Sequence, residues 1–232
     1  RRRAYAPSSA VLSCVPAPLQ QCDSCWYRAN VNCSTPLTFY SSDFTPPSFG
    51  RLALDAFLRR RLERNEFFLH YQAKLDLNTR QITGVEALVR WQHPDLGMVP
   101  PTQFIPLAEE TGLIVPIGKW VLDTACAQNM AWQRSGLPPM RMAVNLSARQ
   151  FAEDDLLEHI ADALEKSGMP PELLELELTE SIVMQNADRA GVVLADIKRL
   201  GVRLAIDDFG VGYSSLTHLK SFPIDTLKVD RS

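Results

Sequence analysis

Two adjacent carboxylates stand in the segment of the chain whose residue types most suggest chemistry. Asp207 and Asp208 directly follow an apolar run, Val202–Ile206, whose length and composition are typical of a strand. Two neighbouring acids repel each other unless a cation, a proton or a partner neutralises them. A cation site is therefore one interpretation of the pair. The alternative is a helix N-cap, because Asp before a helical turn is common in α/β loops.

Other polar residues also stand at the ends of strand-like runs. The set comprises Glu86 with Arg90, Asn145, Glu177 with Glu180, Asp207 with Asp208, and Lys228. The intervals from Asn145 to Glu177 and from Glu177 to Asp207 approach the length of a βαβ unit, which is about 30 residues. A (β/α) barrel brings the carboxyl ends of its strands to one mouth, so we expect these side chains to meet there.

The residue types in this set suit a hard divalent cation. Four members offer oxygen ligands: Glu86, Asn145, Glu177 and Asp207. Such oxygens are the ligands that Mg²⁺ and Mn²⁺ prefer, and the lack of a strand-end His or Cys argues against zinc. Asp208 adds a carboxylate for a second ion, and two ions can stabilise both the entering and the leaving oxygen in phosphoryl displacement. The alternative for each acid taken alone is a solvated strand end.

Regular hydrophobic periodicity begins at Arg51 and predicts the elements that position these residues. We expect a helix at Arg51–Arg64 and an antiparallel strand pair at Phe67–Gln72 and Gly84–Trp91, followed by strands at Arg141–Asn145, Leu173–Leu178, Val202–Ile206 and Ile224–Val229. Amphipathic helices separate the later strands. This alternation indicates an α/β fold with a largely parallel sheet, and the length suits a (β/α) barrel.

Residues 1–49 differ in composition from the rest. They hold four of the five cysteines and contain no Lys or Glu. They also show no sustained period, so we expect a linker or a disordered arm, with the domain at 50–232. A zinc site is the alternative, because Cys22 and Cys25 have the spacing of one ligand pair. Unstructured thiols are favoured over it, because no second pair with that spacing is present.

Composition excludes two classes of protein. The formal net charge of -3 gives no basic excess to neutralise a phosphate backbone, so no nucleic-acid polymer is expected as a partner. No apolar run approaches the roughly 18 residues of a membrane span, so no membrane insertion is expected in this segment. Prolines and serines interrupt the apolar stretch after Arg1, which makes it a poor signal peptide. We therefore expect a reducing, cytoplasmic compartment and a buried Cys126 in a helix.

Seven short motifs give the chain a resemblance to a known family. In chain order they read HYQAKLDL, GVEALVRW, FIPLAEETGLI, VNLSARQF, LELELTES, LAIDDFGVGYSSL and TLKVD. From about Arg51 to Ser232 the chain resembles the EAL family of bacterial cyclic di-GMP phosphodiesterases, whose signature tripeptide corresponds to Glu86-Ala87-Leu88. A lone tripeptide would mean nothing, whereas seven motifs in order are highly specific.

The resemblance implies a TIM-like barrel with an antiparallel first strand. It also implies an enzyme that hydrolyses cyclic di-GMP to linear pGpG with Mg²⁺ or Mn²⁺, two divalent ions being expected. By this resemblance, the ligands of one ion are Glu86, Asn145, Glu177 and Asp207. Asp207 and Asp208 would reach the second ion, and Lys228 corresponds to the lysine that holds the attacking water.

Further correspondences concern the loop after the acid pair and the substrate. By the same resemblance, Glu180 matches the acid that steadies the loop after Asp208. Arg90 matches a phosphate contact, while Gln72 and Leu88 match positions near a guanine base. Asp208 also counts among the substrate-side residues. The assigned roles agree with the chemistry of the residues, since a guanidinium can bind a phosphate in a bidentate manner.

Three departures from the family pattern affect the expected activity. Ala73 replaces the usual Pro after Tyr-Gln, and Val211 stands where Thr is common. The chain ends at Ser232, whereas the family has two more strands carrying Ala-Glu-Gly-Val-Glu and Gln-Gly-Tyr segments. We therefore expect a barrel truncated after about the sixth strand, with open sheet edges that favour a homodimer. The alternative to the enzyme is a catalytically inactive cyclic di-GMP receptor or an inactive fragment, and membrane attachment of the parent protein stays open.

Overall fold

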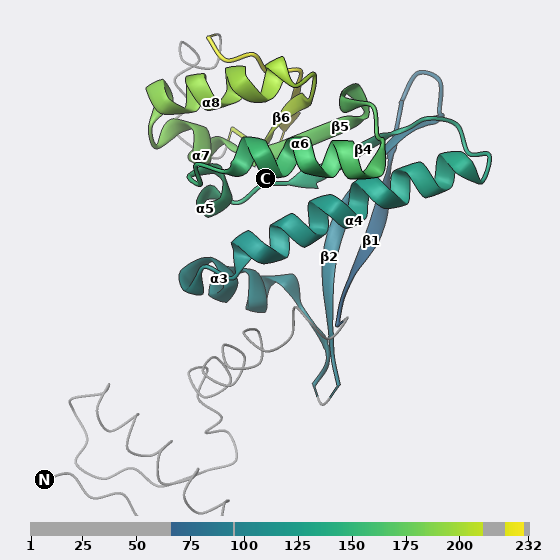
Figure 1. Cartoon of the computed structure of the whole chain (residues 1–232), viewed down its shortest axis with the longest axis horizontal. Coiled ribbons are helices and arrows are strands. Elements are labelled where there is room, and N and C mark those ends of the chain that lie inside the picture. Colours follow the sequence, from purple (N-terminus) through teal and green to yellow (C-terminus); the bar gives the residue numbers. More distant parts are fainter. Residues whose placement is uncertain (1–65, 95, 211–220, 230–232) are drawn as a thin grey trace, which may run out of the picture. The chain divides into compact units, whose positions relative to one another are not determined.

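A twisted sheet with helices along one side makes up the part of the chain that the structure describes (Figure 1). In this computed structural model the described residues are 66–94, 96–210 and 221–229. Segment 1–49 with its cysteines, the expected helix at Arg51–Arg64, and residues 211–220 after the acid pair lie outside these ranges. Within them, no helix combines the length and the apolar character needed to cross a membrane.

The described sheet contains seven strands. They are β1 (Phe67–Leu75), β2 (Ile82–His93), β3 (Gly97–Val99), β4 (Arg141–Asn145), β5 (Leu174–Thr179), β6 (Arg203–Phe209) and β7 (Thr226–Val229). Their order is β1-β2-β4-β5-β6-β7, and β3 pairs with β2. β1 and β3 run antiparallel to β2, while β2, β4, β5, β6 and β7 are parallel. The expected α/β fold with an antiparallel first strand is confirmed.

The hairpin of β1 and β2 runs further than its sequence pattern predicts. The expected Phe67–Gln72 strand continues to Leu75, because the turn begins only at Asp76. The Asp76 carboxylate accepts hydrogen bonds from the amides of Asn78 and Thr79 at 2.9 and 2.8 Å. This Asx turn is the usual role of Asp in a connection between strands.

β6 runs further than the expected strand Val202–Ile206, after which the acid pair was placed. The strand runs on to Phe209, so Asp207 and Asp208 are among its last residues. Pairing with β7 is interrupted after Ile206 and resumes at Phe209. Asp208 has a φ of 54°, which marks a local bulge in the strand. The pair therefore sits at an irregular strand end rather than beyond it.

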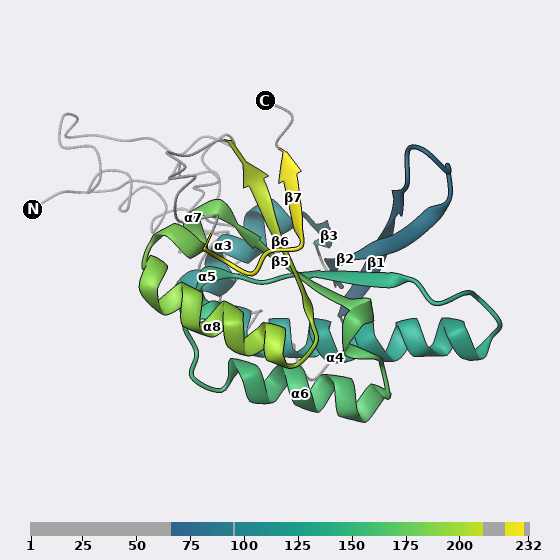
Figure 2. The same ribbon diagram turned by 90° about the horizontal axis from the view of Figure 1, so that it is seen from above.

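Helices connect the parallel strands. They are α3 (Pro101–Thr111), α4 (Ile114–Arg134), α5 (Ala148–Phe151), α6 (Leu156–Ser167), the 3₁₀ helix η2 (Pro171–Leu173), α7 (Glu180–Met184) and α8 (Ala187–Arg199). Figure 2 shows α4, α6 and α8 along one side of the sheet. Gly112 and Gly201, with φ values of 81° and 90°, follow α3 and α8 in the left-handed conformation that glycine adopts most easily.

The core lies between the sheet and these helices. Strand residues of this face are almost fully buried: Met142, Val144, Leu174, Leu176, Leu178, Leu204 and Ile206. Cys126 on α4 is buried among them as expected, and burial raises the pKa of its thiol to about 12. Near the far end of β2, Trp91 packs against Phe67 and Phe104 with ring centroids 5.8 and 5.7 Å apart.

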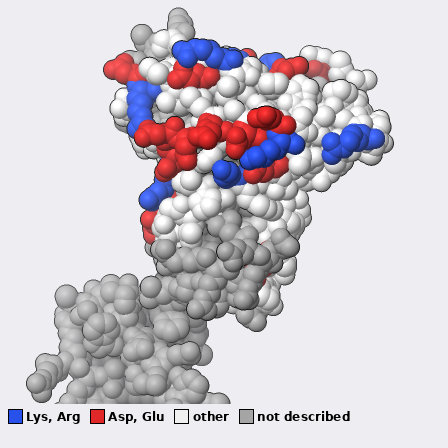
Figure 3. Space-filling model, viewed as in Figure 1, with Lys and Arg blue, Asp and Glu red and all other residues white. Residues whose placement is uncertain are grey.

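The outward side of the helix layer is charged and solvated. Figure 3 shows carboxylates gathered over α6 on this face of the molecule. Two of the pairs along α6 are local: Lys166 to Asp162 at 2.9 Å, and His159 to Asp155 at 3.1 Å. Exposed pairs of this kind contribute little to stability. The helix layer thus separates a wet outer surface from the apolar face of the sheet.

Candidate functional site

The face of the sheet opposite the helices carries the polar residues that the sequence singles out. Side chains alternate along a strand, so residues two apart share a face. Five of the expected residues lie on this second face, one on each of five neighbouring parallel strands: Glu86, Asn145, Glu177, Asp207 and Lys228. We call this group the polar cluster.

Lys228 is the centre of the polar cluster. Its Nζ lies 2.6 Å from Glu177 Oε2, 2.5 Å from Asp207 Oδ2 and 3.4 Å from Glu86 Oε2. Asn145 completes the group, because its Nδ2 donates a hydrogen bond of 2.8 Å to Glu86 Oε1. Three carboxylates from β2, β5 and β6 therefore converge on a single cation.

A second lysine, which sequence reasoning missed, lies beside the polar cluster. Lys74 Nζ is 2.5 Å from Glu177 Oε1 and 2.7 Å from Glu175 Oε1. Glu175 and Glu177 are only 3% and 1% exposed. The signal was present in the strand alternation, because Lys74 stands two residues after Gln72 and Glu175 two residues before Glu177. The expected strand ended at Gln72, which left Lys74 out of the set.

Both lysines carry raised pKa values. Burial alone would lower the pKa of Lys228, but its hydrogen bonds to Asp207 and Glu177, together with nearby carboxylate charge, raise it well above its ordinary value. The pKa of Lys74 is raised in the same way, with hydrogen bonds to Glu175 and Glu177 outweighing burial. Both side chains are therefore protonated at neutral pH, so they can donate hydrogen bonds but cannot accept a proton.

Two of the expected acids lie beside the polar cluster rather than in its ion-pair network. Glu180 is buried at the start of α7, and its Oε2 accepts a hydrogen bond of 3.2 Å from the amide of Gly210, just after β6. Asp208 is exposed, and its amide donates to Asp207 Oδ1 at 2.9 Å. Glu180 thus ties the end of β6 to α7, while the carboxylate of Asp208 faces solvent.

The expected substrate residues line two cavities that border the polar cluster. Gln72 lines a cavity of about 390 Å³ together with Glu86 and Lys228. Leu88 and Arg90 line another, of about 470 Å³, which also includes Asn145 and Glu177 and extends over apolar residues of α3 and α4. The Arg90 guanidinium donates to the carbonyl of Val89 at 2.9 Å. Both cavities have the size of small-molecule sites.

The end of β4 is fixed by contacts that place Asn145. The amide of Leu146 donates to the Glu177 carbonyl at 2.8 Å. Ser147 then caps α5 in a reciprocal capping box with Gln150. A Cβ on Gly118 of α4 would lie 1.9 Å from Gln150 Nε2, so glycine is what allows the Gln150 side chain to lie against α4.

The donors of the polar cluster fit a hard divalent ion in their chemistry. They are carboxylate and amide oxygens, and three carboxylates already converge on one positive charge, the Lys228 ammonium. Among the described residues, no group of three or more His, Cys, Asp or Glu side chains has the arrangement of a formed metal site. Lys228 holds these carboxylates together in the position where a metal ion would compete for them.

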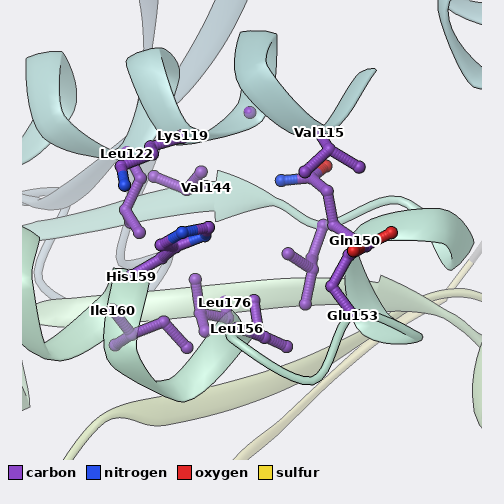
Figure 4. Close-up of a pocket in the computed structure, with 12 residues that line it drawn as sticks. Val115, Lys119, Leu122, Val144, Gln150, Glu153, Leu156, His159, Ile160 and Leu176 are labelled. Atoms are coloured by element: carbon purple, nitrogen blue, oxygen red, sulfur yellow. The ribbon is translucent and has the colours of Figure 1, made fainter. Parts of the chain in front are cut away.

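A third cavity, between α4 and α6, has a different character (Figure 4). It measures only about 20 Å³, enough for roughly one water. Its lining includes the apolar Leu122, Val144 and Leu176 together with Lys119, Glu153 and His159. We regard it as a packing gap in the core, because nothing larger than a water fits.

Curated proteins are similar to this chain in sequence. The chain is 44% identical over 209 residues to the bifunctional diguanylate cyclase/cyclic di-GMP phosphodiesterase MucR of Pseudomonas aeruginosa, covering 90% of this chain and 30% of MucR. It is 37% identical over 215 residues to the cyclic di-GMP phosphodiesterase PdeR of Escherichia coli, covering 93% of this chain and 32% of PdeR. The chain thus spans less than a third of these curated relatives.

Solved structures resemble the described fold. The PaMucR phosphodiesterase in complex with c-di-GMP superposes with a TM-score of 0.75 at 49% identity, covering 77% of this chain and 72% of that one. The EAL enzyme Bd1971, in a form bound to cAMP and cyclic di-GMP, gives 0.72 at 33% identity, covering 81% and 52%. The expected TIM-like barrel is confirmed by this likeness. Residues 55–232 match the EAL domain, and the chain belongs to the EAL domain family.

Proposed function

We propose that this chain is a metal-dependent phosphodiesterase domain that hydrolyses cyclic di-GMP to linear pGpG. The observation that carries the proposal is the convergence of Glu86, Glu177 and Asp207 on one cation, the Lys228 ammonium. Relatives named cyclic di-GMP phosphodiesterases, and an EAL structure solved with c-di-GMP, support the choice of substrate.

The proposed ligands of the first Mg²⁺ or Mn²⁺ ion are Glu86, Asn145, Glu177 and Asp207. Asp207 and the exposed Asp208 are the proposed ligands of a second ion. When bound, such ions lower the pKa of water and neutralise negative charge on phosphoryl oxygens. The ligands come from four neighbouring strands, whose hydrogen bonds fix them before any substrate arrives.

Lys228 has a role that follows from its charge. Lysine is protonated at neutral pH even at its ordinary pKa of 10.5, so Lys228 would donate a hydrogen bond to the oxygen of the attacking water and orient it. The water oxygen bonds to phosphorus as one P–O3′ bond breaks, and the proton that the water gives up, passed through solvent because a protonated lysine cannot take it, balances the proton that O3′ takes up to give pGpG.

The remaining residues bind substrate or brace the site. Arg90 on β2 is the proposed phosphate contact, since a guanidinium binds phosphate oxygens in pairs. Gln72 lines the cavity of about 390 Å³ and Leu88 the cavity of about 470 Å³, and both are proposed contacts to a guanine base. Glu180 holds the Gly210 amide and so steadies the chain that follows Asp208.

A second candidate function is cyclic di-GMP binding without hydrolysis. The observation that favours it is the cavity of about 470 Å³ lined by Leu88 and Arg90, which offers contacts to a base and a phosphate whether or not the carboxylates hold a metal ion. An EAL domain that bound no metal at the polar cluster would hold the dinucleotide but leave it intact. We also propose that the domain lies in the bacterial cytoplasm, where its substrate would be found. We further propose that it forms a homodimer, which light scattering can test.

Turnover separates the two candidates. The chain is incubated with cyclic di-GMP and Mn²⁺, Mg²⁺ or EDTA, and pGpG is measured by chromatography while calorimetry follows binding. We expect metal-dependent turnover that Lys228→Ala lowers by about 10²–10³-fold, the effect of removing one preorganised donor. Lys166→Ala, which alters only an exposed pair on α6, is the matched control. Binding without turnover would favour the receptor.

A further inference from the structure

Lys74 has no role in the proposed reaction, yet it makes two short ion pairs with buried carboxylates. It belongs to β1, the antiparallel strand, and reaches across to β5. Its Nζ bridges Glu175 Oε1 at 2.7 Å and Glu177 Oε1 at 2.5 Å. These two carboxylates stand on the same face of one strand, both buried, so a shared cation offsets their mutual repulsion.

Glu177 is held at both of its oxygens. Lys74 binds Oε1, and Lys228 binds Oε2 from the side of the polar cluster. With Oε1 fixed, the carboxylate cannot rotate, and Oε2 stays directed at the position that Asp207 and Glu86 also face. The contact from Lys74 thus determines how Glu177 presents its second oxygen.

Glu175 in turn fixes Lys74. Its other oxygen, Oε2, accepts a hydrogen bond of 3.3 Å from Thr226 Oγ1 and lies 3.9 Å from Arg141 Nη1. The described ion pairs of Lys228 are with Glu86, Glu177 and Asp207, so Glu175 lies outside the polar cluster. The carboxylate that supports Lys74 is therefore itself held by Arg141 of β4 and Thr226 of β7.

We propose that Lys74 is a positioning residue: with Glu175 as its support, it holds Glu177 in the one orientation in which Oε2 can bind a divalent ion. The inference rests on the proposed function in taking Glu177 as a metal ligand. Its test measures metal binding directly, so that it can fail independently of catalysis.

Charge and position predict opposite results for the loss of Lys74. By charge alone, removing a nearby cation strengthens the attraction of the carboxylates for a metal ion. If Lys74 orients Glu177, its removal weakens binding of the metal ion by about 10–100-fold. This is the usual effect of losing a group that orients a metal ligand. The direction of the change in affinity therefore decides between the two.

The experiment compares Mn²⁺ affinity, measured by electron paramagnetic resonance of the free ion, in wild type, Lys74→Met and Lys74→Arg. We expect Lys74→Met to bind about 10–100-fold more weakly. Lys74→Arg keeps a cation within reach of both carboxylates and restores most of the affinity. Lys166→Met serves as the control for loss of a lysine far from the cluster. Unchanged or tighter binding by a folded Lys74→Met would overturn the inference.

A second variant covers the case in which Lys74→Met fails to fold. Lys74→Met/Glu175→Gln removes the cation together with one of its carboxylates, so the number of buried charges stays balanced. We expect it to fold and still to bind Mn²⁺ weakly; affinity equal to wild type would contradict the role of Lys74. A wild type that binds Mn²⁺ but leaves cyclic di-GMP intact would overturn the proposed enzyme and leave this inference standing.

Discussion

The two faces of the sheet differ sharply although they are built from alternate residues of the same strands. On β5, Leu174, Leu176 and Leu178 face the helices and are almost fully buried. Glu175 and Glu177 alternate with them and are nearly as inaccessible, but both pair with Lys74, and Glu177 pairs with Lys228 as well. One face excludes water with apolar side chains, whereas the other carries paired charges beside two cavities.

The difference separates stability from chemistry. The apolar face gains free energy from burial, at roughly 25 cal/mol per Å². The charged face gains little net stability, because burying an ion pair costs about as much as its attraction returns. Such a costly arrangement makes sense where it prepares charges for a reaction. Substitutions on each face test this division.

Glu177→Gln should affect activity more than any other change to the sheet. The substitution keeps the volume but removes the charge that both lysines bind. Since Glu177 is a proposed metal ligand, we expect turnover of cyclic di-GMP to fall by at least about 100-fold. Glu158→Gln, exposed on α6, is the control. Near-normal turnover by Glu177→Gln would show that the polar cluster is not needed for catalysis.

Leu176→Ala should have the opposite profile, although it is the adjacent residue. Leu176 is 1% exposed on the helix-covered face and lines the small gap between α4 and α6. We expect the free energy of unfolding to fall by about 2–5 kcal/mol in urea titrations, with the turnover of the folded fraction little changed. Lost turnover in a stable variant would show that the two faces are not independent.

Ser147→Ala should have a smaller effect, through the capping box at the start of α5. Loss of a cap costs about 1 kcal/mol of unfolding free energy. Because Ser147 and Gln150 cap each other, a cycle with Gln150→Ala should be non-additive. Thermal unfolding of the two single variants and the double variant measures this coupling, and strictly additive losses would argue against reciprocal capping.

Substitution of Asp225 should have the smallest effect on stability, and the direction in which this effect changes with pH can be predicted. Burial opposes its charge, but hydrogen bonds from Lys198 and the Leu204 amide lower its pKa below the ordinary value of 3.8. Its stabilisation is therefore complete above that ordinary value and is lost as the pH falls through the lower folded value. We expect Asp225→Asn to cost about 1 kcal/mol or less near neutral pH, and the difference in Tm from wild type to shrink below about pH 4. A difference that grows with acid would contradict this sign.

Much of the fold was predictable because its signals are local. Apolar periodicity and the glycines after α3 and α8 indicated the main helices, and the parallel strands followed from their spacing. The short elements β3, α5 and α7 were not predicted, since three to five residues carry too little periodicity. The course of β6 through the acid pair was also missed, because a bulge depends on pairing with β7.

The candidate site was predictable in its residue types but not in its contacts. Strand-end position brought Glu86, Asn145, Glu177 and Lys228 into one set, and the structure brings them into contact. Lys74 was overlooked because the expected strand ended at Gln72, and its partners Glu175 and Glu177 lie about a hundred residues away on β5. Sequence spacing along one strand cannot show such a pair.

The most direct test of the account is the position of manganese in a crystal of the chain grown with Mn²⁺ and cyclic di-GMP, located by anomalous scattering. We expect an ion bound by Glu86, Asn145, Glu177 and Asp207, with the Lys228 ammonium moved off at least one of these carboxylates and Lys74 still paired with Glu177 Oε1. A dinucleotide bound with no manganese at the polar cluster, and Lys228 still paired with all three carboxylates, would contradict it.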